Sequence, residues 1–260
     1  MTIQFEPLEA LRSPQIGLLW GEAFRSDFPN VEEQPPIQHV IEVRQRRLIQ
    51  PDRPQVKVLL RPEAPRFFFV NETGNELLQI QPDRLSSNWR RRGDYDYRRY
   101  RLLKESFQSR FTSLCRFVER EKLGEVVPDQ CELVYVNHVL YPAGAAAHRH
   151  PGDLIEPFDH GYTQVAGATL EDMHLHLRHT LSGDNEEFLG RIFVDMSPGF
   201  AADAKTPLYK VQFTARGGPL GSGLEGSLRI LDLAHDRLLR AFQEFMSDRV
   251  QREWMDAHEH

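Results

Sequence analysis

The sequence predicts an α+β protein made of two halves, each an antiparallel sheet with long helices packed on it. Two observations carry this prediction. Runs of alternating polar and apolar residues, typical of strands, follow one another along the chain. Each series of strands then ends in a stretch whose apolar residues recur at helical spacing. Helices that follow runs of strands, rather than alternate with them, favour α+β over a doubly wound parallel fold.

The first half is expected to open with one helix. Ser13 followed by Pro14 is a helix-start signal, because the hydroxyl can cap free amides and proline tolerates the first helical position. The apolar residues that follow recur at helical spacing and predict a helix over 14–28. Prolines and acidic residues in 29–36 then predict an extended connector.

Four strands and a long helix should complete this half. Alternation predicts the strands, a glycine-containing loop joins the second to the third, and the Pro-Asp pair at 82–83 predicts a turn before the fourth. A stripe of apolar residues predicts a helix that Asp94 or Asp96 can cap and that Gly124 ends. The predicted strands cover 38–48, 66–70, 76–81 and 85–90.

The second half is expected to repeat this plan. Its glycine-rich segment RGGPLGSGLEG lacks the lysine of a phosphate-binding loop and precedes a predicted strand, so it is interpreted as a hairpin loop. Strands are predicted near 130–140, 170–181, 188–196, 208–214 and 227–233, before a closing helix over 236–254. The two halves suggest either an internal duplication of structure or one long curved sheet that holds two helices. We expect either two domains, 1–125 and 126–260, or one continuous domain.

Composition predicts a soluble cytoplasmic protein. Of the 260 residues, 40% are hydrophobic and 27% charged, which is enough apolar material for one large core or two small ones. No stretch approaches the roughly 18 consecutive apolar residues of a membrane helix, and the first residues lack the pattern of a secretory signal. The two cysteines are too few for a disulfide framework and are expected to be buried apolar residues.

An arginine cluster is the first candidate binding surface. The net charge of −6 argues against a wholly basic nucleic-acid-binding domain, so local charge matters more. Arginine offers a planar fork for phosphates, and interleaved tyrosines can stack on bases. The alternative is that nearby aspartates pair with some of these arginines while others form a solvated face. The cluster consists of Arg90, Arg91, Arg92, Arg98, Arg99 and Arg101.

Polar residues within two predicted strands are further candidates for ligand binding. Asn88 precedes the arginine cluster and alternates with Trp89, which is expected in the core. Asn137 and His138 interrupt the otherwise apolar strand VYVNHV. Buried asparagine and histidine need hydrogen-bond partners, so these residues either join the two halves or line a cleft between them.

Histidines in the middle of the chain raise the possibility of a metal site. His174 and His176 share one face of a predicted strand, and His148 and His150 can approach from the long loop before it. No HExxH motif, paired-cysteine set or carboxylate at a diagnostic spacing accompanies them. No cofactor is therefore predicted, and no nucleophile elbow or hydrolase triad is present in the sequence.

Several segments together resemble a sporadically distributed family of uncharacterised bacterial proteins. They are LLQIQPDRLSSNWRRR at 77–92, ELVYVNH at 132–138, EEQPP at 32–36, the first helix and the closing helix after LDLAHD. The resemblance spans nearly the whole chain. It implies no particular activity and no catalytic residues.

The sequence favours a non-enzymatic binding or interaction protein that uses the arginine and tyrosine surface or the cleft between halves. Its partner would be a protein, a nucleic acid or an anionic small molecule, with no membrane involved. One alternative is a metal-dependent hydrolase that uses the central histidines. Another is a structural subunit of a larger complex.

Overall fold

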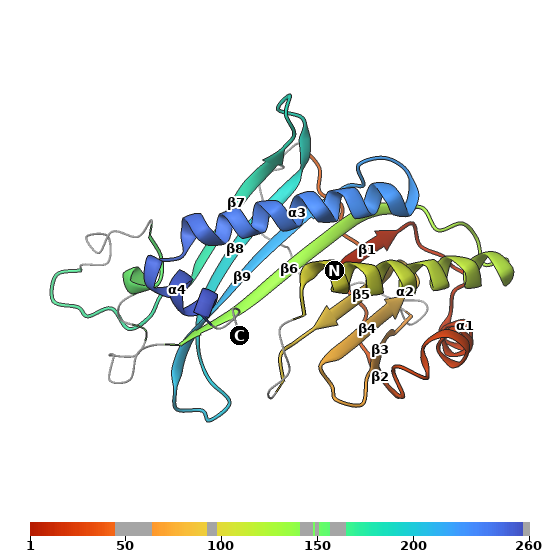
Figure 1. Ribbon diagram of the computed structural model, residues 1–260, viewed down its shortest axis with the longest axis horizontal. Helices are drawn as coiled ribbons and strands as arrows, with labels where there is room; N and C mark the ends of the chain where they lie inside the picture. Colours follow the sequence, from red (N-terminus) through yellow and green to blue (C-terminus); the bar gives the residue numbers. More distant parts are fainter. Residues whose placement is uncertain (45–63, 93–97, 141–147, 149–150, 157–164, 257–260) are drawn as a thin grey trace. The chain divides into compact units, whose positions relative to one another are not determined.

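The chain forms two compact units (Figure 1). The computed structural model describes residues 1–44, 64–92, 98–140, 148, 151–156 and 165–256. Unit 1 contains Met1–Glu132 and Gly217–Leu231, and unit 2 contains Leu133–Arg216 and Asp232–His260. The boundary predicted from the sequence at 125/126 stays a prediction.

Unit 1 is built on a sheet in the order β2-β3-β4-β5-β1-β6, with antiparallel pairing throughout. The N-terminal strand β1 lies between β5 and β6, so the start of the chain is an inner strand. The strands are β1 (Thr2–Phe5), β2 (Asn30–Gln34), β3 (Arg66–Val70), β4 (Glu76–Gln81), β5 (Arg84–Trp89) and β6 (Pro128–Leu140).

One face of this sheet is apolar. Residues directly opposite one another on paired strands point to the same face, so the register defines rows across the sheet. One such row is entirely buried. It consists of Phe67, Ile80, Leu85, Ile3 and Cys131, on β3, β4, β5, β1 and β6 in turn.

Helices cover this apolar face. Phe111 of α2 (Tyr100–Arg120) makes an edge contact with Phe5, with ring centroids 6.2 Å apart. Phe69 of β3 lies 6.4 Å from Trp20, which begins the π-helical turn Trp20–Phe24 after α1 (Ser13–Leu19). The helices leave the opposite face of the sheet to the polar side chains of the same strands.

Unit 2 contains the rest of β6 and the strands β7 (Leu175–Ser182), β8 (Phe188–Phe200) and β9 (Pro207–Gly217), in the order β6-β9-β8-β7. Its core forms against the end of α3 (Gly223–Phe245), where Phe213 contacts Phe242 and Phe245 at 5.9 Å each. A short helix, α4 (Asp248–Asp256), follows.

The structure confirms the α+β class with an antiparallel sheet. The sheet is continuous rather than divided between two halves, because β6 takes part in the pairing of both units and the nine strands have one order. The described residues contain four α-helices, of 7, 21, 23 and 9 residues. The predicted first helix is shortened by the π-helical turn, and the closing helix is divided at Met246 and Ser247.

Three segment predictions were wrong. The expected connector contains the edge strand β2, which pairs with β3. The predicted strand 38–48 is not a strand in its described part, 38–44, where side chains rather than a neighbouring strand bind the backbone. The segment 227–233 is helical, because Ile230, Leu231, Ala234 and Leu238 continue the buried stripe of α3. The glycine-rich segment therefore does lie between a strand and a helix.

Two glycines give opposite predictions for the free energy of unfolding. A Cβ at Gly226, in the first turn of α3, would lie 2.3 Å from the carbonyl oxygen of Gly221, so Gly226→Ala should destabilise the protein by about 1–3 kcal/mol. A Cβ at Gly17 of α1 meets no atom within 4 Å, so Gly17→Ala should stabilise it by about 0.5–1 kcal/mol. Urea unfolding of both variants checks the signs, and equal effects would contradict the packing at Gly226.

Candidate functional site

The polar face of the unit 1 sheet carries a row of hydrogen-bonding side chains. Pairing of neighbouring strands sets Gln81 of β4 opposite Arg84 of β5, Arg84 opposite Gln4 of β1, and Gln4 opposite Gln130 of β6. These four side chains, here called the polar row, are at most 8% exposed. Their alternation with the apolar row beneath α2 places them on the opposite face of the sheet.

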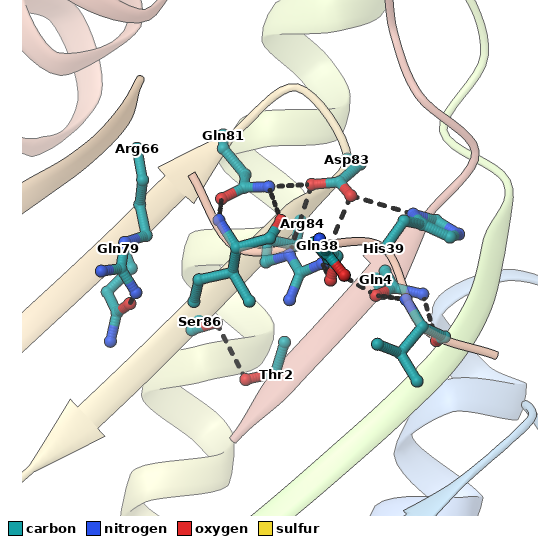
Figure 2. Close-up of polar contacts among 12 residues, drawn as sticks. Thr2, Gln4, Gln38, His39, Arg66, Gln79, Gln81, Asp83, Arg84 and Ser86 are labelled. Atoms are coloured by element: carbon teal, nitrogen blue, oxygen red, sulfur yellow. Dashed lines mark hydrogen bonds and ion pairs between the residues drawn. The ribbon is translucent and has the colours of Figure 1, made fainter. Parts of the chain in front are cut away.

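A chain segment that belongs to no strand lies along the polar row. We call residues 37–43 the strap. The side chain of Gln81 accepts a hydrogen bond from the Ile37 backbone N–H at 3.1 Å and donates one to the Ile37 carbonyl at 2.8 Å (Figure 2). Gln4 binds Val40 in the same way, at 3.1 and 2.8 Å. A glutamine amide thus acts toward the strap as a neighbouring strand would.

Arg84 extends this binding between the two glutamines. Its Nη2 donates to the Gln38 carbonyl at 2.7 Å and to Gln4 Oε1 at 3.0 Å (Figure 2). The same guanidinium contacts both carboxylate oxygens of Asp83, each at 3.3 Å. Asp83 is 6% exposed and also accepts a 2.7 Å hydrogen bond from Gln81. The strap backbone and the buried ion pair therefore share one hydrogen-bond network.

His39 anchors the strap through its side chain. Its Nδ1 lies 2.9 Å from Asp83 Oδ2 and its Nε2 lies 2.7 Å from Asp129 Oδ2. Each ring nitrogen of His39 thus faces a different carboxylate, and the side chain bridges β4–β5 and β6. We call Asp83 and Asp129 the acidic clamp. Burial raises the pKa of Asp83, but hydrogen bonds from Arg84 and His39 outweigh this effect and hold the pKa below its usual value of 3.8.

Gln130, at the end of the polar row, binds the strap with only one of its two amide atoms. Its Oε1 accepts a hydrogen bond from the Glu42 N–H at 2.8 Å. Its Nε2 is buried and has no hydrogen-bond partner in the described part of the chain. Gln81 and Gln4 each use both amide atoms on the strap, whereas Gln130 uses one. A buried amide donor without an acceptor is unfavourable, so the strap fits this end of the row less well.

The strap exposes apolar side chains to solvent. Ile37 and Val40 are each 40% exposed, Ile41 is 53% exposed and Val43 is 58% exposed. Backbone contacts to the polar row hold Ile37 and Val40 in place while their side chains stay partly exposed. We call these four side chains the apolar ridge.

Part of the arginine cluster is engaged within unit 1. Arg90 donates to the Gly74 carbonyl at 3.0 Å, and Arg98 forms an ion pair with Glu76, which also pairs with Arg110 of α2. Arg101 lies 3.8 Å from Glu105. The side chains of Arg91, Arg92 and Arg99 are exposed. Tyr95, Tyr97, Asp94 and Asp96, which the sequence placed among these arginines, lie outside the described residues.

The other predicted polar residues lie on different surfaces. Asn88 is exposed on β5, on the same face as the polar row by strand alternation, two positions beyond Ser86. His138 of β6 is exposed and Asn137 is half-buried. The structure gives none of these three a hydrogen bond to the strap, and their role in binding stays a prediction.

The central histidines lie in separate environments. His148 Nε2 lies 2.9 Å from the carbonyl oxygens of both Gly199 and Leu208, so this nitrogen donates to backbone rather than being open to a metal. His176 Nδ1 bonds to Asp195 at 2.5 Å, and His174 is exposed just before β7. His150 lies outside the described residues. Within the part of the chain that the structure describes, no group of three or more potential ligands could hold a metal ion.

The polar face of unit 2 is held by contacts among its own side chains. Arg178 of β7 and Arg216 of β9 each place a guanidinium 5.5 Å from the centre of the Phe193 ring. His176 lies beside the same ring, with centroids 6.1 Å apart. Alternation along these strands is therefore accompanied by cation–π packing on the solvent side.

The cysteines do not have the properties of nucleophiles. Burial raises the pKa of Cys131 to about 12 and that of Cys115 to about 11. A thiol with so high a pKa is almost wholly protonated at neutral pH and unreactive. Within unit 1, amide, guanidinium and carboxylate groups bind the backbone of the strap and the side chain of His39.

Sequence reasoning missed the polar row, the strap and the acidic clamp. The available signal was the alternation of glutamines with apolar residues in TIQF, LLQIQP and DQCEL. It identifies a polar strand face but not the register that aligns the four side chains. That register depends on β1, which the sequence analysis did not predict.

The chain matches no protein-family model, no curated protein and no solved structure. The resemblance to a sporadic bacterial family stays a prediction. Among the described helices, none combines the length and apolar character needed to cross a membrane.

The pKa of Asp83 gives a prediction for stability as a function of pH. Because its folded-state pKa is lowered, its contribution to the free energy of unfolding is fully present above about pH 4 and is lost as pH falls through the folded-state value. Asp83→Asn should therefore destabilise the protein by about 1–3 kcal/mol at pH 7, and by less at pH 3. Urea unfolding at both values checks this. An exposed control, Glu105→Gln, should change stability by about 0.5 kcal/mol or less, and an Asp83→Asn effect that grows toward low pH would contradict the assignment.

Hydrogen exchange tests the docking of the strap. Gln4→Ala removes the acceptor of the Val40 N–H, so this amide should exchange about tenfold faster or more. Thr2→Ala is the matched control. Thr2 is on the same strand and face, but its side chain bonds to Ser86 and not to the strap. An unchanged Val40 rate in Gln4→Ala would show that the strap does not depend on the polar row.

Proposed function

We propose that the protein is a non-enzymatic interaction protein and that unit 1 presents the strap to a partner protein. The observation that carries this proposal is the apolar ridge on a backbone held by the polar row. Four aliphatic side chains are exposed within seven residues. Exposed apolar side chains gathered in a short segment are a common feature of protein–protein contact sites.

The way in which the strap is held supports a role in presentation. Gln81, Gln4 and Gln130 bind its backbone, and the acidic clamp binds His39, so its aliphatic side chains are left for external contacts. A segment whose backbone is already ordered loses little conformational entropy when a partner binds it. The ridge is therefore pre-organised for association.

The polar groups of unit 1 favour recognition over catalysis. Both ring nitrogens of His39 are bonded to carboxylates, which leaves neither for proton transfer to a substrate. Asp83 is bonded to Arg84, Gln81 and His39. The same groups that would serve as acid or base are used to hold the strap.

The arginine surface remains a proposed second contact. The exposed side chains of Arg91, Arg92 and Arg99 favour an acidic or phosphate-bearing partner there. A metal-dependent hydrolase and a structural subunit stay alternatives from the sequence.

Charge placed on the ridge tests the proposal. The double variant Ile41→Asp with Val43→Asp should lose a partner that the wild-type protein captures from its native cells, because aspartates cannot be buried in an apolar contact. Leu18→Asp is the matched control, since Leu18 is a 55% exposed aliphatic residue on α1. Quantitative mass spectrometry of the captured proteins is the measurement. A partner set that is the same for all three proteins would contradict a role for the ridge.

A further inference from the structure

We propose that the polar row and the acidic clamp form a binding site for an extended segment of a partner protein that carries a basic side chain, and that the strap occupies this site within the chain. This inference rests on the proposed role of unit 1 in protein interaction and names the chemistry of the partner. It differs from the proposed function in one respect. There the strap stays on the polar row, whereas here a segment of the partner replaces it.

The polar row binds backbone N–H and C=O groups of the strap. The bonds from Gln81 and Gln4 go to the N–H and C=O groups of Ile37 and Val40, and Arg84 binds the carbonyl of Gln38. Every polypeptide offers these groups. Contacts of this kind hold an extended peptide without selecting its sequence, as main-chain bonds do when a peptide adds to a sheet edge.

At Gln130 the spacing of the strands does not match the advance of an extended chain across them. The strap crosses the strands, which lie about 4.8 Å apart, while extended residues advance about 3.3 Å each. From Gln81 to Gln4 is two strand spacings, about 9.6 Å, and the three residues from Ile37 to Val40 span about 10 Å. From Gln4 to Gln130 is one spacing, about 4.8 Å, but the two residues from Val40 to Glu42 span about 6.6 Å. Two fully extended residues would overreach this step, so the chain between Val40 and Glu42, whose N–H bonds to Gln130 Oε1 at 2.8 Å, is not the spacing that a regular extended segment would have.

The mismatch coincides with an unsatisfied group. Gln130 is 3% exposed, and its Nε2 has no hydrogen-bond partner in the described part of the chain. The row therefore offers a donor, aimed at the strap side of the sheet, that the strap does not use. An occupant with a carbonyl oxygen in register with Gln130 would satisfy it. The site is thus better matched to another extended segment than to its own.

The charges at the acidic clamp favour a basic side chain. Asp83 and Asp129 contribute two negative charges and Arg84 one positive charge, so the site without His39 has a net charge of −1. His39 places one ring nitrogen against each carboxylate, at 2.9 and 2.7 Å. Lysine or arginine can make the same contacts. The acidic clamp therefore favours one basic side chain in an otherwise sequence-tolerant site.

The strap is suited to exchange. Its side chains Ile37, Val40, Ile41 and Val43 are 40–58% exposed, and its backbone is held by hydrogen bonds from the polar row. Segments held by hydrogen bonds rather than by buried apolar contacts open at low free energy. As part of the same chain, the strap is present at a high effective concentration and competes with any partner segment. Weakening the strap should therefore open the site to an external peptide.

A binding experiment with a synthetic peptide tests this inference. The probe is the fluorescently labelled peptide PIQHVIEVR, the sequence of residues 36–44. His39→Ala in the full-length protein removes the anchor of the strap and leaves the polar row and the acidic clamp intact. Fluorescence anisotropy should give a Kd about tenfold lower or more for His39→Ala than for the wild-type protein, because the competing strap is weakened.

Variation of the peptide separates specific binding from folding defects. Against the same His39→Ala protein, a peptide with lysine in place of its histidine should bind within about threefold of the parent peptide, whereas one with alanine should bind about tenfold more weakly. The further change Asp129→Asn in this protein should weaken the parent peptide by a similar factor. Glu105→Gln, which removes an exposed carboxylate on α2, is the control and should leave the Kd unchanged.

Two results would overturn the inference. One is the absence of binding by all three peptides to a His39→Ala protein that unfolds cooperatively in urea. The other is binding that depends neither on the basic residue of the peptide nor on Asp129. Failure here is distinguishable from failure of the proposed function. Suppose that charge on the ridge still abolishes partner capture while no peptide binds. The strap then stays bound to the polar row, and only the inference that a partner segment replaces it is refuted.

Discussion

The hydrogen bonds between glutamine side chains and the strap backbone are the constraint on which unit 1 depends. Backbone N–H and C=O groups near a sheet need partners, and the strap has no neighbouring strand to supply them. Gln81 and Gln4 each supply a donor and an acceptor from one amide, at 2.8–3.1 Å. Only an amide side chain offers both groups with the spacing of a peptide unit.

This constraint explains why the register of the sheet matters. The polar row exists only if β4, β5, β1 and β6 are paired so that their glutamines and Arg84 are directly opposite one another. A slip of one residue in β1 would move Gln4 to the helix side and bring Ile3 or Phe5 to the strap. The buried row of Ile3, Leu85 and Ile80 on the other face fixes this register through apolar burial beneath the helices.

The buried charges of unit 1 are compensated by one another. Arg84 and Asp83 are 8% and 6% exposed, a position that is strongly unfavourable for an isolated charge. Their mutual contacts, together with Gln81, Gln4 and His39, distribute hydrogen bonds over both groups. Such a network gives little net stability, but it ties the side chain of His39 to the buried ion pair. The position of the strap is therefore coupled to the buried charges of the sheet.

The sequence by itself determined the elements that rest on local pattern. The strands β3 and β4 have the bounds that alternation predicted, Arg66–Val70 and Glu76–Gln81, because strand periodicity and turn residues act over a few neighbouring positions. Only the tertiary structure decided that β1 lies between β5 and β6, that 227–233 continues a helix, and that the strap lies along four glutamine and arginine side chains. Those features depend on pairing between residues as far apart as Gln4 and Gln130, and His39 and Asp129, and no local periodicity encodes a contact over such a separation.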